Sequence, residues 1–185
     1  MKSLKKILVD MVPVILGVLI ALFINDWKQG YDDQRFLTKA LASIDKEMTI
    51  NLDEFSETLP KQYALIDTIE VYLDDNEITL TDIFVKSKGL QVPTVKNTSW
   101  KSFLNSKMEL VDFEVISKLT DIEESKGLMG KKLDGLMDFV LNNSESTEAV
   151  SKKKLMIQLL NLIDSEEQLL SSYEEYLEIE NKASR

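Results

Sequence analysis

The residue types that most often perform catalysis are missing from this chain. Its 185 residues include no histidine and no cysteine. This removes the commonest general base, the thiolate nucleophiles and the usual ligands of transition metals. Carboxylates are abundant, but neighbouring acids such as Glu123 and Glu124 are typical of the solvated face of a helix. We therefore predict that the protein is not an enzyme and has no catalytic residues.

One acidic loop, Asp74-Asp75-Asn76-Glu77, has a composition that calcium sites share. An EF-hand loop needs oxygen ligands at positions 1, 3 and 5 and a glycine at position 6. Counted from Asp74, the fifth residue is Ile78 and the sixth is Thr79, so the loop does not match. The chain also lacks a glycine-rich phosphate loop and a nucleophile elbow. The sequence thus predicts no metal site, no cofactor and no small-molecule substrate.

The N-terminal segment 1–27 has the pattern of a transmembrane anchor. Three lysines precede an apolar run over 7–24, and a helix over 4–24 would measure about 31 Å, enough to cross a bilayer core. A cleaved signal peptide would end in small residues, whereas this run ends Leu22-Phe23-Ile24. A helix packed on the surface of a soluble core would carry a polar stripe, which 11–24 lacks. Trp27 follows where an interfacial aromatic belt would lie, so we predict an uncleaved anchor.

The charges on either side of the apolar run predict its orientation. Three basic residues lie on each side, within about 15 residues of the span, but Lys2, Lys5 and Lys6 are the more tightly clustered set. They also adjoin the α-amino group. The positive-inside rule then places the N-terminus in the cytoplasm. We expect a single-pass protein of the cell inner membrane with a periplasmic C-terminal domain.

Three residues inside the span are candidates for contact with another transmembrane helix, namely Asp10, Gly17 and Ala21. Gly17 and Ala21 form a small-xxx-small step that lets a second helix approach closely. Asp10 has two interpretations. A carboxylate in hydrocarbon normally marks a partner or a pathway, but near the headgroups Lys6, one turn earlier, would neutralise it.

The remainder, 28–185, is predicted to be one acidic soluble domain. The chain has 22 basic and 32 acidic residues, a net charge of −10. Such a surface repels nucleic acid and anionic headgroups, so we expect no nucleic-acid partner. Six glycines, three prolines and abundant Leu, Lys and Glu favour helix over sheet.

Apolar spacings of three and four residues predict the helices of this domain. A helix follows the span, Pro60 is expected to end or kink it, and a second segment covers 61–73. Thr81 or Asp82 is expected to cap a short helix that Gly89 stops, and 91–97 to be extended. Thr98 and Ser99 are expected to cap another short helix. Long helices are predicted at about 112–141, with Phe113 first in its apolar stripe, and 148–182.

Amphipathic helices of this kind bury their stripes by packing side by side. The predicted fold class is therefore all-α, with an N-terminal transmembrane helix followed by an antiparallel helical bundle. The domains are a transmembrane anchor, 1–27, and a soluble acidic helical-bundle domain, 28–185. Trp100 and Phe103 are expected to anchor a short helix in the core or, alternatively, to line a ligand groove.

Two stretches carry a resemblance to a known family. The first, about 10–51, contains Asp10, Gly17, Ala21, Asn25 and Trp27 and continues to Glu47-Met48 and Asn51. The second, about 98–119, begins Thr98-Ser99-Trp100-Lys101-Ser102-Phe103. Together they resemble an uncharacterised family of single-span membrane proteins, a domain of unknown function common in Bacteroidota. Ser106-Lys107 stands where the family leads us to expect Ser-Gly, so the turn there is expected to differ. The resemblance implies an anchor and a helical domain, and it implies no activity or site residue.

These patterns favour a non-catalytic, membrane-anchored interaction protein, such as a scaffold or accessory subunit of an envelope membrane complex. Its expected partners are the lipid bilayer and either another membrane protein or a second copy of itself. The alternative is a ligand-sensing helical domain that acts through a partner protein, because the chain offers a single span and only a short segment before it.

Overall fold

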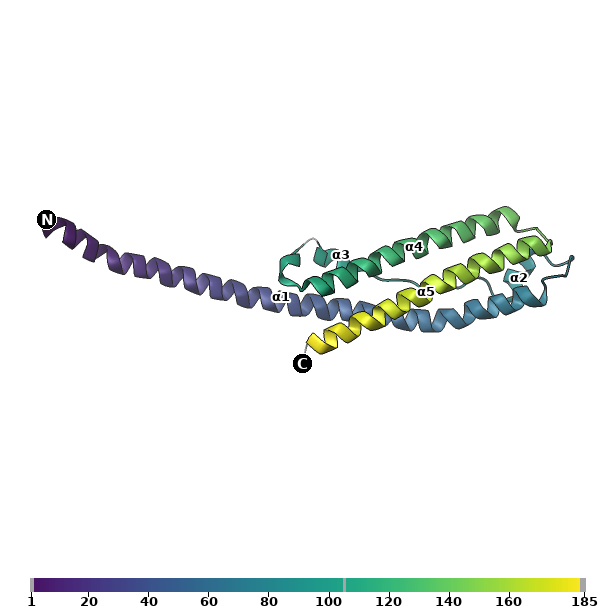
Figure 1. Ribbon diagram of the computed structural model, residues 1–185, viewed down its shortest axis with the longest axis horizontal. Coiled ribbons are helices and arrows are strands. Elements are labelled where there is room, and N and C mark those ends of the chain that lie inside the picture. Colours follow the sequence, from purple (N-terminus) through teal and green to yellow (C-terminus); the bar gives the residue numbers. More distant parts are fainter. Residues whose placement is uncertain (1, 105, 184–185) are drawn as a thin grey trace. The chain divides into compact units, whose positions relative to one another are not determined.

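The computed structural model describes the backbone of residues 2–104 and 106–183 and the side chains of residues 11–104 and 106–179. Over those residues the fold is all-helical, which confirms the predicted fold class. The helices are α1 (Lys2–Val71), α2 (Leu80–Lys86), α3 (Thr98–Leu104), α4 (Phe113–Asn143) and α5 (Ala149–Ala183), with a 3₁₀ turn, η1, at Met108–Leu110 (Figure 1). The chain divides into two compact units, Met1–Ala42 and Ser43–Arg185, and α1 contributes to both.

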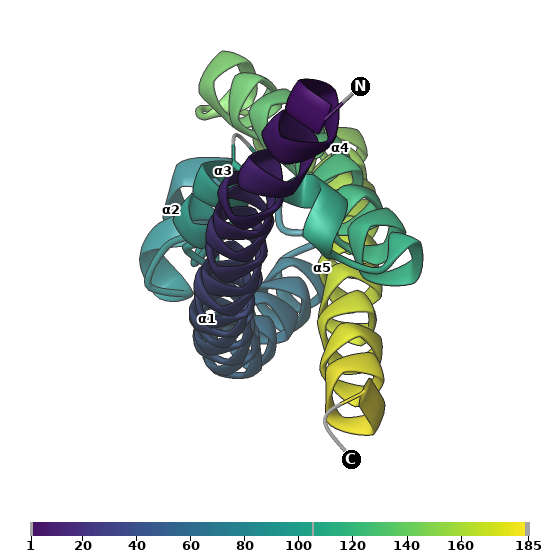
Figure 2. The same ribbon diagram turned by 90° about the vertical axis from the view of Figure 1, so that its left-hand side faces the viewer.

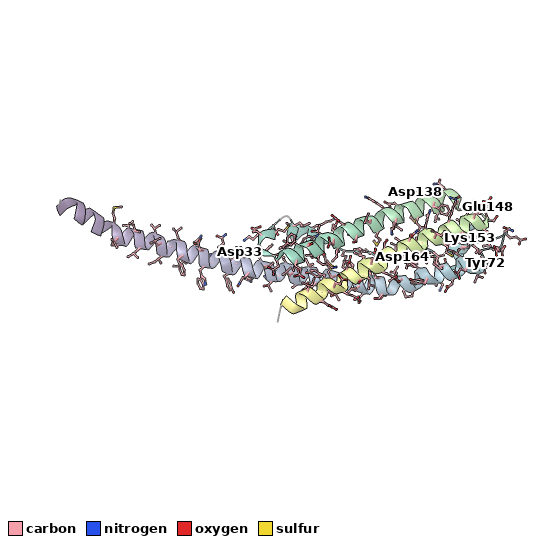
Figure 3. All side chains as sticks on the ribbon, in the orientation of Figure 1. Asp33, Tyr72, Asp138, Glu148, Lys153 and Asp164 are labelled. Carbon is pink, nitrogen blue, oxygen red and sulfur yellow. The ribbon has the colours of Figure 1, made fainter. Side chains whose placement is uncertain are left out.

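The first unit consists of the N-terminal part of α1. Its large apolar side chains from Met11 to Ile24 are each 50–73% exposed, on every side of the helix. Side chains project all round this part of α1 in Figure 3. The helix is long and apolar enough here to cross a membrane, close to the N-terminus. Trp27 and Tyr31, which follow the apolar segment, are exposed as well.

The second unit contains three long helical segments. α4 and α5 run antiparallel and pack directly against each other (Figures 1 and 2). The C-terminal part of α1 joins them through side chains from α5: the ring of Phe55 lies 6.0 Å from that of Tyr173. α2 is attached to the turn between α4 and α5, because the backbone N–H groups of Leu80 and Thr81 donate to the carbonyls of Ser146 and Ser144.

The core follows alternate spacings of four and three residues, the pattern of a coiled-coil seam. We call the buried series on α1 the α1 seam: Ile44, Met48, Asn51, Phe55, Thr58, Gln62, Leu65 and Ile69. The α5 seam is the matching series Lys152, Leu155, Leu159, Leu162, Glu166, Leu169, Tyr173 and Tyr176. Most members are apolar, as the predicted stripes require, but five of them are polar or charged.

The prediction that the helix ends at Pro60 is wrong, because α1 continues through it to Val71. Pro60 lacks an N–H, so it leaves the carbonyl of Ser56 without its helical donor. Both residues are exposed, and water can satisfy that carbonyl. Phe55 and Leu65, on either side, are buried in the same core and keep the helix in one piece.

The short helices begin with different caps from those predicted. The N-cap of α2 is Thr79 rather than Thr81 or Asp82, and Asp82 completes a capping box by accepting from the Thr79 backbone N–H. α3 begins at Thr98, and the Ser99 N–H in its first turn donates to the Glu47 carboxylate at 2.9 Å. A side chain of α1 therefore provides what we expected from Thr98 or Ser99. The expectation missed this because a tertiary cap leaves no local pattern in the sequence.

Two aromatic predictions have opposite outcomes. Trp100 and Phe103 are each 2% exposed, with ring centroids 6.1 Å apart, so their interpretation as core anchors is confirmed. Phe113 is 82% exposed and does not belong to the core stripe of α4. It is the first residue of α4, and the stripe begins with Val115 instead.

Candidate functional site

The acidic loop that superficially resembled a calcium site ends a helix. The buried Nζ of Lys152, from the start of α5, donates to the Tyr72 carbonyl at 2.9 Å and also to the Asp75 carbonyl. A cation here adds a donor to backbone carbonyls just beyond the end of α1 and opposes the negative end of its dipole. Figure 3 shows Tyr72 at the same end of the bundle as Lys153, which follows Lys152 in the chain. Among the described residues, no group of three or more acids lies close enough to hold a metal ion.

A segment without helix or strand, 90–97, which we call the strap, connects α2 to α3. Such a segment has no partner strand or helical turn for its backbone, and these groups need other partners. Asn51 of the α1 seam supplies two: its Nδ2 donates to the Lys96 carbonyl and its Oδ1 accepts from the Lys96 N–H, both at 2.8 Å. Asn51 is fully buried, so its amide replaces a strand partner inside the core.

Gln62 holds the other end of the strap. Its Nε2 donates to the Gln91 carbonyl at 2.8 Å, three helical turns beyond Asn51 on the same face of α1. α4 contacts the strap from another side: Lys126 Nζ donates to the Val95 carbonyl at 3.2 Å, and Asn97 donates to Glu123 at 2.7 Å. Hydrogen bonds to its backbone carbonyls and from the Asn97 side chain thus fix the strap to α1 and α4.

The Gln62 amide also contacts a buried acid. Its Nε2 lies 3.1 Å from Oε1 of Glu166 on α5, and both side chains are fully buried. Oε2 of Glu166 and Oε1 of Gln62 have no hydrogen-bond partner among the described residues. Burial raises the pKa of Glu166 from 4.5 to about 7, an effect that the hydrogen bond from Gln62 partly opposes.

Two tyrosines of the α5 seam extend this polar layer toward Asp45. Tyr173 hydrogen-bonds with Asn51, and burial raises the pKa of the Tyr173 phenol. Tyr176 donates to Asp45 Oδ1 at 3.0 Å, and burial raises the pKa of that carboxyl. Hydroxyls at the edge of an apolar core find partners in this way. Asn51 is therefore fixed by both the strap and α5.

An apolar groove lies between the strap, α2 and α4, with a volume of about 600 Å³. Its lining, which defines the groove, is Thr81, Phe84, Gly89, Leu90, Val92, Leu133, Met137 and Val140. None of these side chains is charged, and the Thr81 hydroxyl already donates to the Ser144 carbonyl at 3.1 Å. This size and lining suit an apolar ligand or apolar side chains of a partner.

The candidate contact residues of the sequence lie in the first unit, away from this layer in the chain. Gly17 and Ala21 are exposed, and a Cβ added at Gly17 would have nothing within 4 Å. Trp27 is 73% exposed. Asp10 lies within α1, but its side chain is outside the described residues.

The predictions missed Asn51, Gln62, Lys152 and Glu166 because polar residues were assigned to solvated faces. Their spacing in the chain identifies them, since each occupies a position where the three-four series requires a core residue. No family model, curated protein or solved structure matches the chain, so the comparisons assign neither a family nor a role to these residues.

Proposed function

We propose that this chain is a non-catalytic, membrane-anchored interaction protein, a scaffold or accessory subunit of an envelope membrane complex. The observation that carries the proposal is the apolar surface of 11–24, exposed on every side of α1. A helical surface of this kind is stable in a bilayer. The lack of histidine and cysteine in the whole chain supports interaction rather than catalysis.

The orientation follows from the flanking charges. Lys2, Lys5 and Lys6 form the tighter basic cluster, which places the N-terminus in the cytoplasm and the acidic helical bundle in the periplasm. The location is then the inner membrane.

The contact face inside the bilayer is proposed to contain Asp10, Gly17, Ala21 and Ile24. At 100° per residue their spacings place these four positions within about 60° of one another around α1. A glycine and an alanine on one side let a second helix approach closely, and an acid on the same side favours a polar or charged partner there. The partner is another membrane protein or a second copy of this chain.

Site-specific photocrosslinking of the full chain in native membranes tests this face. A photoreactive residue at Ile24 is expected to yield one discrete protein adduct, and mass spectrometry distinguishes a second copy from another protein. The same probe at Leu19, on the opposite side of α1, is the matched control and should label lipid only. Gly17→Leu should abolish the adduct at Ile24. Equal labelling from Ile24 and Leu19, or an adduct that survives Gly17→Leu, would contradict the proposed contact.

The apolar groove favours a second candidate, a ligand-sensing bundle that acts through a partner protein. Methyl-labelled methionine NMR of the full chain in nanodiscs can test it with decanol as the probe. Decanol is expected to shift the Met137 methyl resonance and leave the core Met48 unchanged. Val140→Trp should fill the groove and remove the shift. No shift at Met137, or an undiminished one in Val140→Trp, would eliminate this candidate.

A further inference from the structure

The strongest unused feature of the molecule is a buried carboxyl connected to the strap through a single amide. Gln62 Nε2 contacts both Glu166 Oε1, at 3.1 Å, and the Gln91 carbonyl, at 2.8 Å. The carboxamide has two protons on this nitrogen, so it can donate to both acceptors at once. The acid on α5 and the backbone of the strap therefore share one donor group on α1.

The surroundings of Glu166 provide no counter-charge. On α1, Glu166 contacts the neutral side-chain amide of Gln62. The same amide also donates to the Gln91 carbonyl of the strap. The nearby lysines of α4 are directed elsewhere: Lys126 donates to the Val95 carbonyl, and Lys132 to the Asn161 carbonyl and the Ser165 hydroxyl. The ion pairs of the described residues do not include Glu166.

The neighbouring charged groups on α1 and α5 point away as well. Tyr63 donates its hydroxyl to the exposed Glu167 at 2.8 Å, and Asp164 is exposed. A carboxylate that is fully buried, with one oxygen unpartnered and no cation beside it, is costly when ionised. The neutral acid fits this site, whereas the ionised form needs water or a cation.

We propose that Glu166, Gln62 and the Gln91 carbonyl form a protonation-dependent latch that controls how tightly the strap is held on α1. With Glu166 neutral, the carboxyl stays buried and Gln62 keeps both contacts. When Glu166 loses its proton, water enters between α1 and α5 to solvate the charge. That water competes for the Gln62 amide protons and weakens its bond to the Gln91 carbonyl.

The groove lies next to this latch. Leu90 and Val92, the chain neighbours of Gln91, both line it. Release of Gln91 therefore moves one wall of the groove, so protonation of Glu166 regulates its shape. The latch itself is a property of the fold and does not depend on what occupies the groove.

The direction of the pH effect follows from the pKa of Glu166, which is 4.5 as its ordinary value and about 7 in the folded protein. Glu166 binds its proton more tightly in the folded state than in the open state. Protection of the strap amides from hydrogen exchange is therefore greatest below pH 4.5 and is lost as pH rises toward 7. An acid in a salt bridge has the opposite pH dependence, because its stabilising effect is lost as pH falls. If opening fully hydrates Glu166, the shift sets a limit of ~300-fold on the change in the opening equilibrium.

Hydrogen exchange of the full chain in nanodiscs tests the latch, with rates corrected for the intrinsic effect of pH. In the wild type, protection of the strap amides is expected to fall at least tenfold between pH 5.5 and 8. Glu166→Gln, a neutral isostere, should give a strap whose protection does not change with pH. The control Glu174→Gln alters an exposed acid of the same helix and should keep the wild-type profile.

A second variant covers the case in which Glu166→Gln does not fold. Glu166→Leu places an apolar residue at the same position of the α5 seam and should also remove the pH dependence. Strap protection that stays constant with pH in the wild type would overturn the latch. So would a wild-type pH profile in either Glu166 variant, because the response would then belong to another group such as Asp45.

Discussion

α1 contains two apolar patterns within one helix, and they differ in where polar residues occur. In 11–24 every side of the helix is apolar and exposed. In 44–69 the buried side chains are those of the α1 seam and Ile66, and the seam includes Asn51, Thr58 and Gln62. A lipid-facing surface has no partner for a polar side chain, whereas a protein core accepts one that finds a hydrogen bond. In the second pattern, two of these polar side chains, Asn51 and Gln62, bind another segment of the chain.

That segment is the strap. Its extended backbone would leave unpaired groups in an apolar core, and Asn51 and Gln62 pair with two of its residues, Lys96 and Gln91. Polar residues at seam positions also limit how helices can align, because a shift in register would separate them from their partners. Stability and specificity therefore come from different residues of the same seam.

The largest difference is expected between two phenylalanines, one in each pattern of α1. Phe55 is fully buried and Phe23 is 73% exposed. Phe55→Ala should lower the free energy of unfolding of the second unit by about 3–5 kcal/mol, because it removes buried area and leaves a cavity. Phe23→Ala should leave that free energy unchanged. Urea unfolding in nanodiscs can be followed by fluorescence of the buried Trp100 in a Trp27→Phe background. Equal losses from the two substitutions would break the comparison.

A pair of asparagines should show an intermediate effect. Asn51→Leu removes both hydrogen bonds to Lys96 and takes the Asn51 partner from the Lys96 N–H and carbonyl. The free energy of unfolding should fall by about 2–3 kcal/mol. Asn25→Leu, at an exposed position of the same helix, is the matched control and should leave the second unit unaffected. Hydrogen exchange of the strap amides measures both. Full protection of the strap in Asn51→Leu would show that the asparagine does not hold it.

The smallest effect is expected at Gly30, between the two patterns. A Cβ there would have nothing within 4 Å, and Gly30 lies inside α1 with ordinary helical geometry. Gly30→Ala should reduce local opening of 26–34 by about 0.5–1 kcal/mol, because alanine has the higher helix propensity. Gly89→Ala should act in the opposite direction, since Gly89 has a φ of 84°. Amide exchange near residue 30 should become slower in Gly30→Ala. Amide exchange near residue 89 should become faster in Gly89→Ala, and this contrast would sharpen the comparison.

The sequence predicted the helices well because their apolar spacing is regular. The two long C-terminal helices begin and end within two residues of their predicted bounds, and Leu155, Leu159 and Leu162 of α5 lie in the core. Helix propensity allowed the helix to end at Pro60, but α1 continues past it, with Phe55 and Leu65 packed in the core on either side. Local patterns thus fix the elements, and packing decides where they end.

The polar layer was not predicted, for a physical reason. Asn51 and Gln62 bind backbone groups 29 to 45 residues away, and Gln62 meets Glu166 across 104 residues. Such contacts depend on how the strap lies, which composition and spacing do not specify. What the spacing does provide is the position: a polar residue at each of these sites breaks an otherwise apolar series.

The central claim is that α1 contains one segment that is apolar on every side and a second segment that is buried along the α1 seam. Site-directed spin labelling tests it most directly. The chain has no cysteine, so single cysteines from 14 to 24 and from 44 to 69 can be labelled in the full chain in bilayers. At every position of 14–24 the label should be inaccessible to a polar nickel complex, and oxygen accessibility should be high except on the proposed contact face of Gly17, Ala21 and Ile24. Across 44–69 nickel accessibility should vary with a helical period, lowest at the α1 seam. A helical period of nickel accessibility within 14–24 would contradict the account, because that segment would then face water on one side.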